Sequence, residues 1–414
     1  MKKVDNIIFL SNTVKMNVGG PCGYLANLQI GLKDIKTKDV VLLHYDKSNK
    51  YHKICKKLCK LLTFWIINTD KRHSLQNKLK RFFSIEDKDR YNHEESLYRC
   101  MVKKLNKYDF KTITCHTCRD VLNIRKYLDA KGLSGKVKLL QMEHSPSFES
   151  IEIYNLLHDS GDSRANDIAK EWRKFEKSAF LASDIILAPA PEALDSYRKD
   201  AKWFDEMLKH KPVKYVPTGC VPLHSDYSSQ EIRKKYNIKT KNVICYIGRH
   251  LPVRGYETLK RVGMKLLKKR DDVTFLIAGK QEVAYPAPIH ERWIEAGYSK
   301  TADILKASDL MILANKTAYF DLILLETMSM GTPVIVSNVN GNKAVHRQTK
   351  GAIEIFETEQ ELMKKIIKIL DMSEQSKKKM SKNILNEYAC NYTTTIFAKN
   401  YVKMIKEVIN GTHK

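Results

Sequence analysis

Glu326 is the side chain in this sequence whose surroundings most clearly suggest ligand binding. The apolar residues 322–325 lead into it, a helix of small residues follows, and the strand 334–336 comes next. A carboxylate at the mouth of a helix can accept hydrogen bonds from vicinal hydroxyls, such as those of a ribose. Ligands of parallel sheets bind outside the carboxyl ends of the strands, so the polar loops 315–321 and 337–342 should contact substrate. The pattern predicts a nucleotide-sugar site.

His144 is a second candidate, because it follows the predicted strand 136–142 directly. An imidazole can hydrogen-bond a hydroxyl or move a proton near neutral pH. His116 ends the preceding strand, 111–115, and is the competing candidate. A lone histidine is more often structural, but a place at the carboxyl end of a strand favours the functional interpretation of His144.

Two arginines, Arg249 and Arg254, follow the predicted strand 242–247 and are flanked by glycines. Fixed cations directed at a phosphate are the main means of stabilising it without a metal, and arginine adds bidentate geometry. The alternative is a pair of surface arginines beside a turn. Gly19 and Gly20 lie in a turn before a helix, where backbone amides could approach a phosphate.

The elements that must position these side chains alternate between strand and helix along the whole chain. Predicted strands of the first half lie at 4–10, 40–45, 111–115, 136–142 and 184–188, and those of the second half at 242–247, 273–278, 310–314, 334–337 and 352–355. This alternation predicts an α/β protein with two Rossmann-like domains. We place the first at 1–215 and the second at 216–390. Residues 391–414 hold a helix, near 394–409, which is long enough to pack back on the first domain.

The formal charge of +26 implies an anionic partner, such as a membrane surface, nucleic acid or a phosphorylated substrate, or else a lysine-rich genome composition. A basic insertion near 47–106 carries an apolar stripe with Trp65, flanked by lysines. Such a helix suits an anionic membrane surface, and the alternative is a domain helix with solvated lysines. The chain has no nucleic-acid motif, so we expect no nucleic-acid partner.

The cysteines indicate reduced thiols in a cytoplasmic protein, because the nine are odd in number and scattered. The amino-terminal residues 1–10 read as a first strand without a signal-peptide cleavage site. The pairs Cys115/Cys118 and Cys55/Cys59 lack a matching second pair. An Asp-Lys-Asp triplet at 87–89 lies in a charged run with no strand before it. We therefore predict no metal and no cofactor.

These motifs together resemble the retaining nucleotide-sugar glycosyltransferases of family 4, which act in bacterial cell-surface polysaccharide synthesis. The family has the GT-B architecture of two facing domains with a cleft between them. Agreement is best over residues 241–345, whereas 47–106 match nothing in the family. The segment 248–255 is similar to the family's Gly-Arg-x-x-Pro-x-Lys-Gly, with Arg254 in place of the lysine. The resemblance implies that Arg249 and Arg254 hold the donor diphosphate and neutralise the leaving group.

The resemblance also assigns roles to other positions. It places Glu326 on the ribose hydroxyls, as the second glutamate of a Glu-x7-Glu motif, and His144 against the transferred sugar. It further implies donor contacts for Gly19 and Gly20, for the turn of Phe320, Asp321 and Leu322, and for Tyr298 beside the nucleobase. The first glutamate of the motif falls at Ala318, which is a departure from the family.

The expected function is transfer of a sugar from a nucleoside diphosphate, UDP above all, to a hydroxyl of a lipid-linked, polymeric or protein-linked acceptor. The resemblance implies retention of configuration and independence of metal. The enzyme would be cytoplasmic and peripheral on the inner face of the plasma membrane. Ala318 leaves open an inactive partner subunit instead. Nucleic-acid binding rests on charge alone, and a nucleotide-sugar epimerase would need a carboxylate pair that the sequence does not offer.

Overall fold

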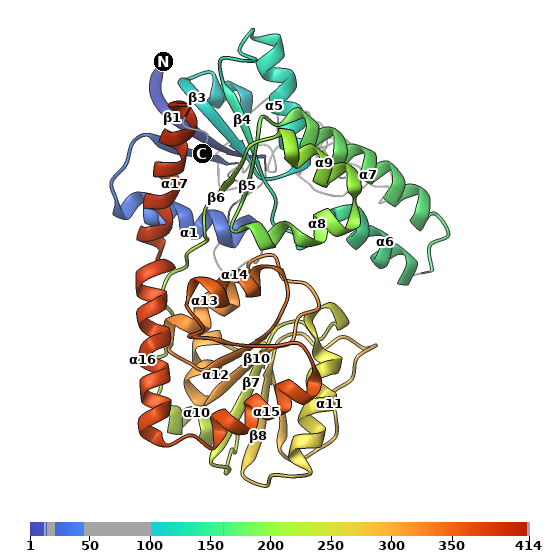
Figure 1. The fold of residues 1–414 in the computed structure, drawn as a ribbon, viewed down its shortest axis with the longest axis vertical. Coiled ribbons are helices and arrows are strands. Elements are labelled where there is room, and N and C mark those ends of the chain that lie inside the picture. The colour runs from blue at the N-terminus through green and yellow to red at the C-terminus, as the bar shows by residue number, and fades with distance from the viewer. Residues whose placement is uncertain (12–13, 15–20, 45–100, 160, 412–414) are drawn as a thin grey trace, which may run out of the picture.

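The protein consists of two parallel, six-stranded sheets, each covered by helices on both faces, arranged one above the other (Figure 1). The computed structural model describes residues 1–11, 14, 21–44, 101–159 and 161–411, and every structural statement below concerns these residues. Gly19, Gly20, Trp65, both cysteines of the 55/59 pair and the acidic triplet at 87–89 lie outside them, as does most of the basic insertion. The architecture confirms the prediction of two Rossmann-like domains.

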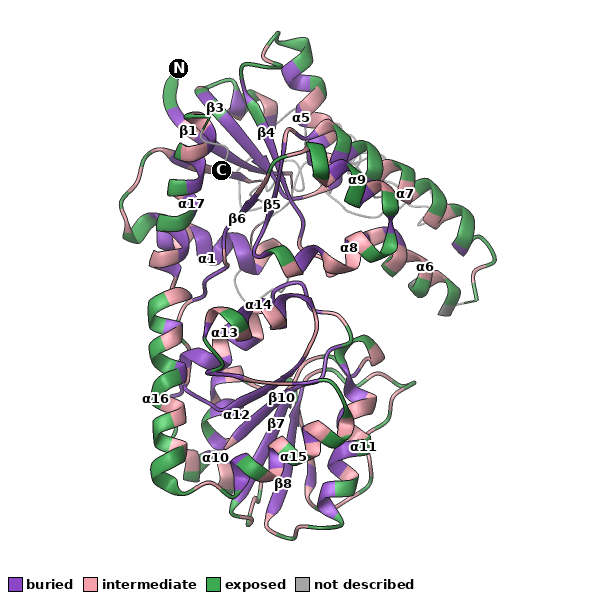
Figure 2. Ribbon diagram, viewed as in Figure 1, coloured by how far each residue is buried: buried purple, intermediate pink, exposed green. Residues whose placement is uncertain are grey.

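The first sheet has the strand order β2-β1-β3-β4-β5-β6, and all its neighbours pair in parallel. Its inner strands are mostly buried, as a parallel sheet between helices requires, whereas the edge strands β2 and β6 are only partly buried (Figure 2). The strands are β1 (Lys2–Leu10), β2 (Val40–His44), β3 (Tyr108–Cys115), β4 (Lys138–Met142), β5 (Ile185–Ala188) and β6 (Val213–Tyr215). The helices are α1 (Pro21–Asp34), α5 (Cys118–Ala130), α6 (Glu149–Asp159), α7 (Ala165–Ala182), α8 (Asp195–Asp200) and α9 (Lys202–His210).

The second sheet has the order β12-β11-β10-β7-β8-β9 and is also parallel throughout. Its strands are β7 (Asn242–Ile247), β8 (Val273–Ala278), β9 (Trp293–Gly297), β10 (Leu310–Leu313), β11 (Val334–Ser337) and β12 (Glu354–Phe356). Its helices are α10 (Ser229–Lys235), α11 (Tyr256–Leu267), α12 (Thr301–Ala307), α13 (Leu322–Ser329), α14 (Asn340–Gln348), α15 (Glu359–Leu370) and α16 (Glu374–Asn391). A short helical turn, η2 (Pro252–Arg254), follows β7.

The last helix, α17 (Thr394–Ile409), leaves the second domain and packs on α1 of the first (Figure 1). The helices approach closely, since a Cβ on Gly31 would lie 2.0 Å from the backbone oxygen of Thr394. At the centre, the Tyr401 hydroxyl donates to Thr114 Oγ1 at 2.9 Å and accepts from Asn6 Nδ2 at 3.1 Å. Helix α17, near the end of the chain, therefore contributes side chains to the interior of the first domain.

Helix α13 corrects one expectation from the sequence. It begins at Leu322, so the apolar run is its first turn, and Glu326 lies in the second turn rather than at the helix mouth. Four consecutive apolar residues carry no periodicity that separates a helix from a connecting segment. Burial decides the matter, because Leu324 and Leu325 are fully buried in the second-domain core.

The two edge strands of the second sheet also differ from the sequence prediction. The edge strand β12 begins two residues and ends one residue later than predicted, because Ala352 and Ile353 are buried in the approach to the strand rather than within it. Strand β9 was not predicted, since the charged Glu295 interrupts its apolar run. No helix among the described ranges is long and apolar enough to cross a membrane.

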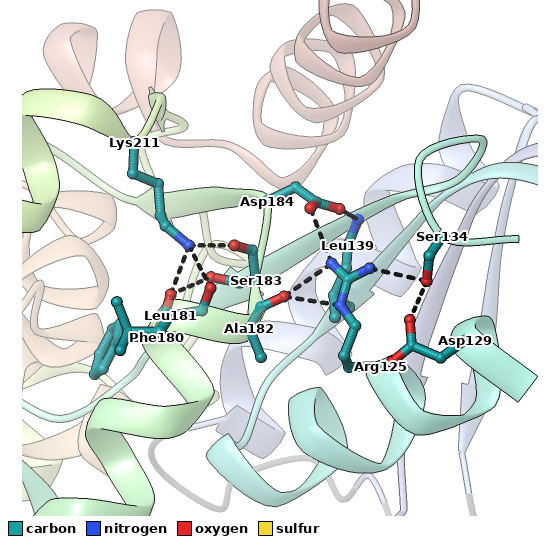
Figure 3. A network of polar contacts seen from close by, with 10 residues as sticks. All are labelled: Arg125, Asp129, Ser134, Leu139, Phe180, Leu181, Ala182, Ser183, Asp184 and Lys211. Carbon is teal, nitrogen blue, oxygen red and sulfur yellow. Dashed lines mark hydrogen bonds and ion pairs between the residues drawn. The ribbon is translucent and has the colours of Figure 1, made fainter.

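A polar network ties α5 and α7 to the starts of β4 and β5, away from the carboxyl ends of the strands (Figure 3). The Arg125 guanidinium donates twice to the backbone oxygen of Ala182 and forms an ion pair with Asp184 at 2.9 Å. The Lys211 ammonium donates to the backbone oxygens of Phe180, at 2.7 Å, and Leu181, at 3.1 Å, and to that of Ser183. These oxygens belong to the carboxyl end of α7 and the turn after it, where helical partners are missing.

We predict that Lys211→Met destabilises the protein by about 1–2 kcal/mol, because it removes a donor from each of these carbonyls. The Phe180 carbonyl would still accept from the Ser183 hydroxyl at 2.9 Å. The measurement is equilibrium unfolding in urea. The matched control is Lys209→Met, since Lys209 is exposed and pairs with Glu206 at 2.6 Å. A similar loss of stability in both variants would contradict the capping role of Lys211.

Candidate active site

The loop between β10 and α13 joins the two domains at the carboxyl ends of their strands. Tyr319 in this loop is buried in the core of the first domain, whereas the next residue, Phe320, is buried in the core of the second. The Tyr319 phenol lies close enough to Glu143, at the end of β4, for their charges to interact. The loop that the sequence assigns to the donor is thereby held against the strand end that carries His144.

His144 lies directly after β4 and forms a hydrogen bond with His116, which follows β3. The distance from His116 Nδ1 to His144 Nε2 is 2.8 Å, and the two rings lie edge to edge, with centroids 5.1 Å and planes 21° apart. The Tyr24 ring of α1 meets His144 edge-on, with centroids 4.9 Å apart. Burial lowers the pKa of His144 to about 3. The imidazole is therefore neutral at physiological pH, which suits hydrogen bonding to a hydroxyl better than carrying charge.

Glu143 is a buried acid that sequence analysis did not single out. It accepts hydrogen bonds from Gln141 Nε2 at 2.6 Å and from Cys118 Sγ at 3.5 Å. Burial raises its pKa to about 8, and the carboxylates of Glu149 and Glu176 add to the increase. Its position beside His144 at the end of a strand could have identified Glu143 as a candidate. Its raised pKa could not have been predicted, because it depends on packing that one sequence does not give.

We predict that the protein loses stability as pH rises through neutrality. Burial raises the pKa of Glu143 to about 8 and that of Glu176 to about 7, both above the usual value of 4.5. The folded state then holds protons that the unfolded state has released, so this stabilisation is full below pH 4.5 and is lost as pH rises through about 8. Melting temperatures between about pH 6.5 and pH 8.5 measure the effect. Below pH 6.5 the buried His116 and His144, whose pKa values are lowered from 6.5, contribute a change of the opposite sign.

Glu143→Gln should flatten part of this decline, because the amide does not ionise. The matched control is Glu171→Gln, since Glu171 is exposed and pairs with Lys174 at 2.7 Å. An unchanged decline in Glu143→Gln would show that this carboxyl is not the group that titrates.

Arg249 and Arg254 both lie beyond the carboxyl end of β7, and each has a carboxylate partner. Arg249 Nη2 lies 3.0 Å from Glu282 Oε1, and Arg254 Nη1 lies 3.1 Å from Asp321 Oδ1. Their side chains remain 63% and 46% exposed, respectively. An anionic ligand can therefore reach both cations, and it would compete with Glu282 and Asp321 for them.

The turn that carries Arg254 is fixed by Gly255. This glycine has a φ of +72°, and a Cβ would lie 1.7 Å from the backbone oxygen of Ala314, at the end of β10. Only glycine allows this contact. The contact brings Arg254 onto the loop after β10, where Asp321 also lies.

Asp321 is held between Arg254 and Asn315, whose side-chain amide donates to its second oxygen. The Asp321 carboxylate raises the pKa of Arg254. Ala318 is buried, and its backbone oxygen accepts from the Gly341 amide at 2.9 Å. The chain thus lacks a carboxylate at 318 but presents one three residues later, in contact with a candidate phosphate-binding cation.

Glu326 faces a different part of the site. Its side chain is half-buried, and burial raises its pKa. Among the described residues no donor or cation pairs with this carboxylate. A carboxylate that is desolvated without a partner is costly, so its oxygens are available to hydroxyl donors of a ligand.

The remaining predicted residues have different outcomes. Tyr298, in the loop after β9, is 94% exposed, and Leu322 packs against the second-domain core. Gly19 and Gly20 lie outside the described residues. Sequence analysis missed Glu282, Asn315 and Tyr319 as individual site residues, although each lies in a loop after a strand of the second sheet. That position was the signal that could have found them.

A polar pocket of about 320 Å³ opens beside Asn315, in the region of the polar loops predicted to contact substrate. Its lining comes from Thr258, Ala314, Asn315, Ser337, Asn338, Val339, Phe356, Glu357 and Glu359. Within the described part of the chain, no group of three or more His, Cys, Asp or Glu side chains is arranged to hold a metal. Metal independence stays a prediction.

The sequence of the second domain matches a known family. Residues 228–387 match the family described as Glycosyl transferases group 1. The chain is 20% identical over 256 residues to alpha-D-kanosaminyltransferase of Streptomyces kanamyceticus, covering 59% of this chain and 65% of that protein. It is 27% identical over 192 residues to mannosylfructose-phosphate synthase of Agrobacterium fabrum, covering 41% and 40%. The chain thus spans less than two thirds of the length of these relatives.

Solved structures match over almost the whole chain. The catalytic domain of starch synthase IV from Arabidopsis thaliana, bound to ADP and acarbose, has a TM-score of 0.64 at 13% identity, covering 99% of each chain. Anabaena HepE in complex with UDP-glucose has a TM-score of 0.60 at 13% identity, covering 98% of this chain and 99% of that one. At these identities the likeness establishes the fold. The second domain is therefore similar to the glycosyl transferases group 1 over residues 228–387, and the solved structures share the fold of two parallel-sheet domains.

Proposed function

We propose that this protein transfers a sugar from a UDP-sugar to a hydroxyl of a lipid-linked, polymeric or protein-linked acceptor, with retention of configuration and without a metal. The observation that carries the proposal is the Glu326 carboxylate, which has no partner among the described residues and lies on the same edge of the second sheet as Arg249 and Arg254. A carboxylate for ribose hydroxyls and two cations for a diphosphate match the two ends of a nucleoside diphosphate. The UDP and UDP-glucose complexes of a structural neighbour support uridine as the base.

The mechanism we propose is a front-face displacement. The bond from the sugar's anomeric carbon to the diphosphate breaks, the acceptor oxygen bonds to that carbon from the same face, and the departing phosphate oxygen takes the acceptor's proton. Arg249 and Arg254 stabilise the negative charge that grows on the diphosphate. His144 hydrogen-bonds the transferred sugar as a neutral group, in keeping with its lowered pKa.

The test is a thermal-shift panel with UDP, GDP, ADP and several UDP-sugars on the full chain. A ligand that binds only the folded state raises the melting temperature according to its concentration relative to Kd. We expect a UDP-selective increase that Glu326→Ala and Arg249→Ala both reduce. No response to any nucleotide would overturn the proposal.

Transfer itself is tested with the UDP-sugar that stabilises the protein most, by following release of UDP. Unchanged release in EDTA is expected, and loss of release that Mg²⁺ or Mn²⁺ restores would overturn metal independence. UDP binding without release, with hydroxyl acceptors of each class present, would instead favour the inactive partner subunit that Ala318 leaves open.

We further propose that the enzyme works in the cytoplasm at an anionic membrane surface. The charge of +26 supports this, together with a basic, tryptophan-bearing insertion. Co-sedimentation of the full chain with vesicles that contain phosphatidylglycerol, but not with neutral vesicles, is the expected result. Equal binding to both kinds of vesicle, or to neither, would contradict it.

A further inference from the structure

His116 and His144 form a pair whose hydrogen bond restricts where their protons lie. The bond joins His116 Nδ1 to His144 Nε2 at 2.8 Å. Burial lowers the pKa of both rings far below neutrality, so each carries a single proton. Two neutral imidazoles in contact share one proton in the bond between them, because two N–H groups would repel and two bare nitrogens would form no bond.

The surroundings of His116 decide which ring supplies that proton. His116 is only 2% exposed, and its other nitrogen, Nε2, is buried with no hydrogen-bond partner in the described chain. If His144 were the donor, His116 would have to carry its proton on Nε2, as a buried N–H without an acceptor. Buried N–H groups without partners are rarer in proteins than buried acceptors without partners.

We infer that His116 donates its Nδ1–H to His144 Nε2, and that it thereby fixes His144 as the tautomer protonated on Nδ1. The Nδ1 atom of His144 makes no hydrogen bond to the described residues and is not sealed inside the protein. His144 therefore presents an N–H donor to its surroundings. His116 is a positioning residue, because it acts only through the ring of His144.

This inference deepens the proposed function, on which its consequence for substrate rests. A fixed N–H donor at the end of β4 selects an oxygen acceptor on the transferred sugar. The ring cannot serve there as a general base, because its only bare nitrogen is occupied by His116. The pair thus gives His144 an orienting role, and proton transfer falls to the leaving diphosphate.

The direct test is nuclear magnetic resonance of the full chain with isotope-labelled histidine. Nitrogen chemical shifts and two-bond couplings report which ring nitrogen carries the proton, and His116→Asn and His144→Asn variants assign the signals. We expect both rings to be protonated on Nδ1 and bare on Nε2. A His144 ring protonated on Nε2 would overturn the inference, whether or not the protein binds any nucleotide.

The functional test compares two substitutions of His116. Asparagine keeps an N–H donor near the position of Nδ1, so His116→Asn should retain the wild-type affinities. His116→Leu removes the donor, and we expect it to weaken binding of the best UDP-sugar by about tenfold while UDP binds as before. The matched control is His210→Asn, on an exposed histidine at the end of α9.

The outcomes separate the two proposals. The positioning role would be overturned if His116→Leu and His116→Asn changed the affinity for the UDP-sugar equally. It would also be overturned if His116→Leu weakened UDP as much as the UDP-sugar. A protein that binds no nucleotide at all would overturn the proposed function, while the tautomer measurement would still decide the proton positions. If His116→Leu does not fold, the wild-type spectrum and the His116→Asn variant still decide the inference.

Discussion

Arg254→Ala should lower the rate of sugar transfer by about a hundredfold to a thousandfold, the range seen when one fixed donor to a developing negative charge is removed. Arg254 is the less exposed of the two cations, at 46%, and it is held in place by Asp321 and by the tight turn at Gly255. Arg249 is 63% exposed, so water screens it more, and Arg249→Ala should cost about tenfold. Steady-state kinetics with the UDP-sugar chosen by the thermal-shift panel measure both losses.

The matched control for Arg254 is Arg261→Ala. Arg261 lies on the neighbouring helix α11, is similarly exposed at 54%, and pairs with Glu359 at 2.7 Å. Binding measurements locate the effect, because Arg254→Ala should weaken UDP and leave uridine unchanged. Equal losses for Arg254→Ala and Arg261→Ala, or equal weakening of uridine and UDP, would contradict a diphosphate role.

Asp321 gives the Arg254 prediction a further consequence. In the free protein its carboxylate neutralises the cation at 3.1 Å, and a bound diphosphate would have to share or replace that contact. The positive charge of Arg254 is therefore already paired in the free protein. This pairing lowers the free-energy cost of placing the guanidinium on a partly desolvated loop.

Glu326→Ala should remove the preference of the protein for ribose over deoxyribose. The wild type is expected to bind UDP about tenfold or more tightly than 2′-deoxy-UDP, because the deoxy ligand leaves one hydrogen bond of a half-buried carboxylate unmade. In Glu326→Ala the two ligands should bind alike. Isothermal titration with both nucleotides gives the ratio directly.

Glu374→Ala is the control for this experiment, since Glu374 is 75% exposed at the start of α16 and pairs only loosely with Lys377 at 3.9 Å. Glu326→Gln separates charge from geometry, because glutamine can still accept a hydrogen bond from one hydroxyl. A wild-type protein that binds both nucleotides equally would remove Glu326 from the ribose site, even if UDP still binds.

Much of the fold follows from local patterns. Strands β7, β8 and β11 and helix α17 have the bounds that apolar runs and helical periodicity predict, because each is a buried run between clear turn residues. The differences concern elements whose pattern is weak, namely the four-residue apolar run of α13 and the charged edge strand β9. In such segments tertiary burial decides the conformation, and one sequence does not record it.

The sequence by itself determined which side chains lie at the carboxyl ends of the strands, and hence the candidates Arg249, Arg254 and His144. It also singled out Glu326, but placed it at the mouth of its helix rather than in the second turn. Only the tertiary structure decided their partners: Asp321 for Arg254, His116 for His144 and, within the described part of the chain, none for Glu326. The physical reason is that strand order and loop packing bring together residues far apart in the chain. Protonation states follow from the same cause, because the pKa of a buried group depends on neighbours that only the folded chain supplies.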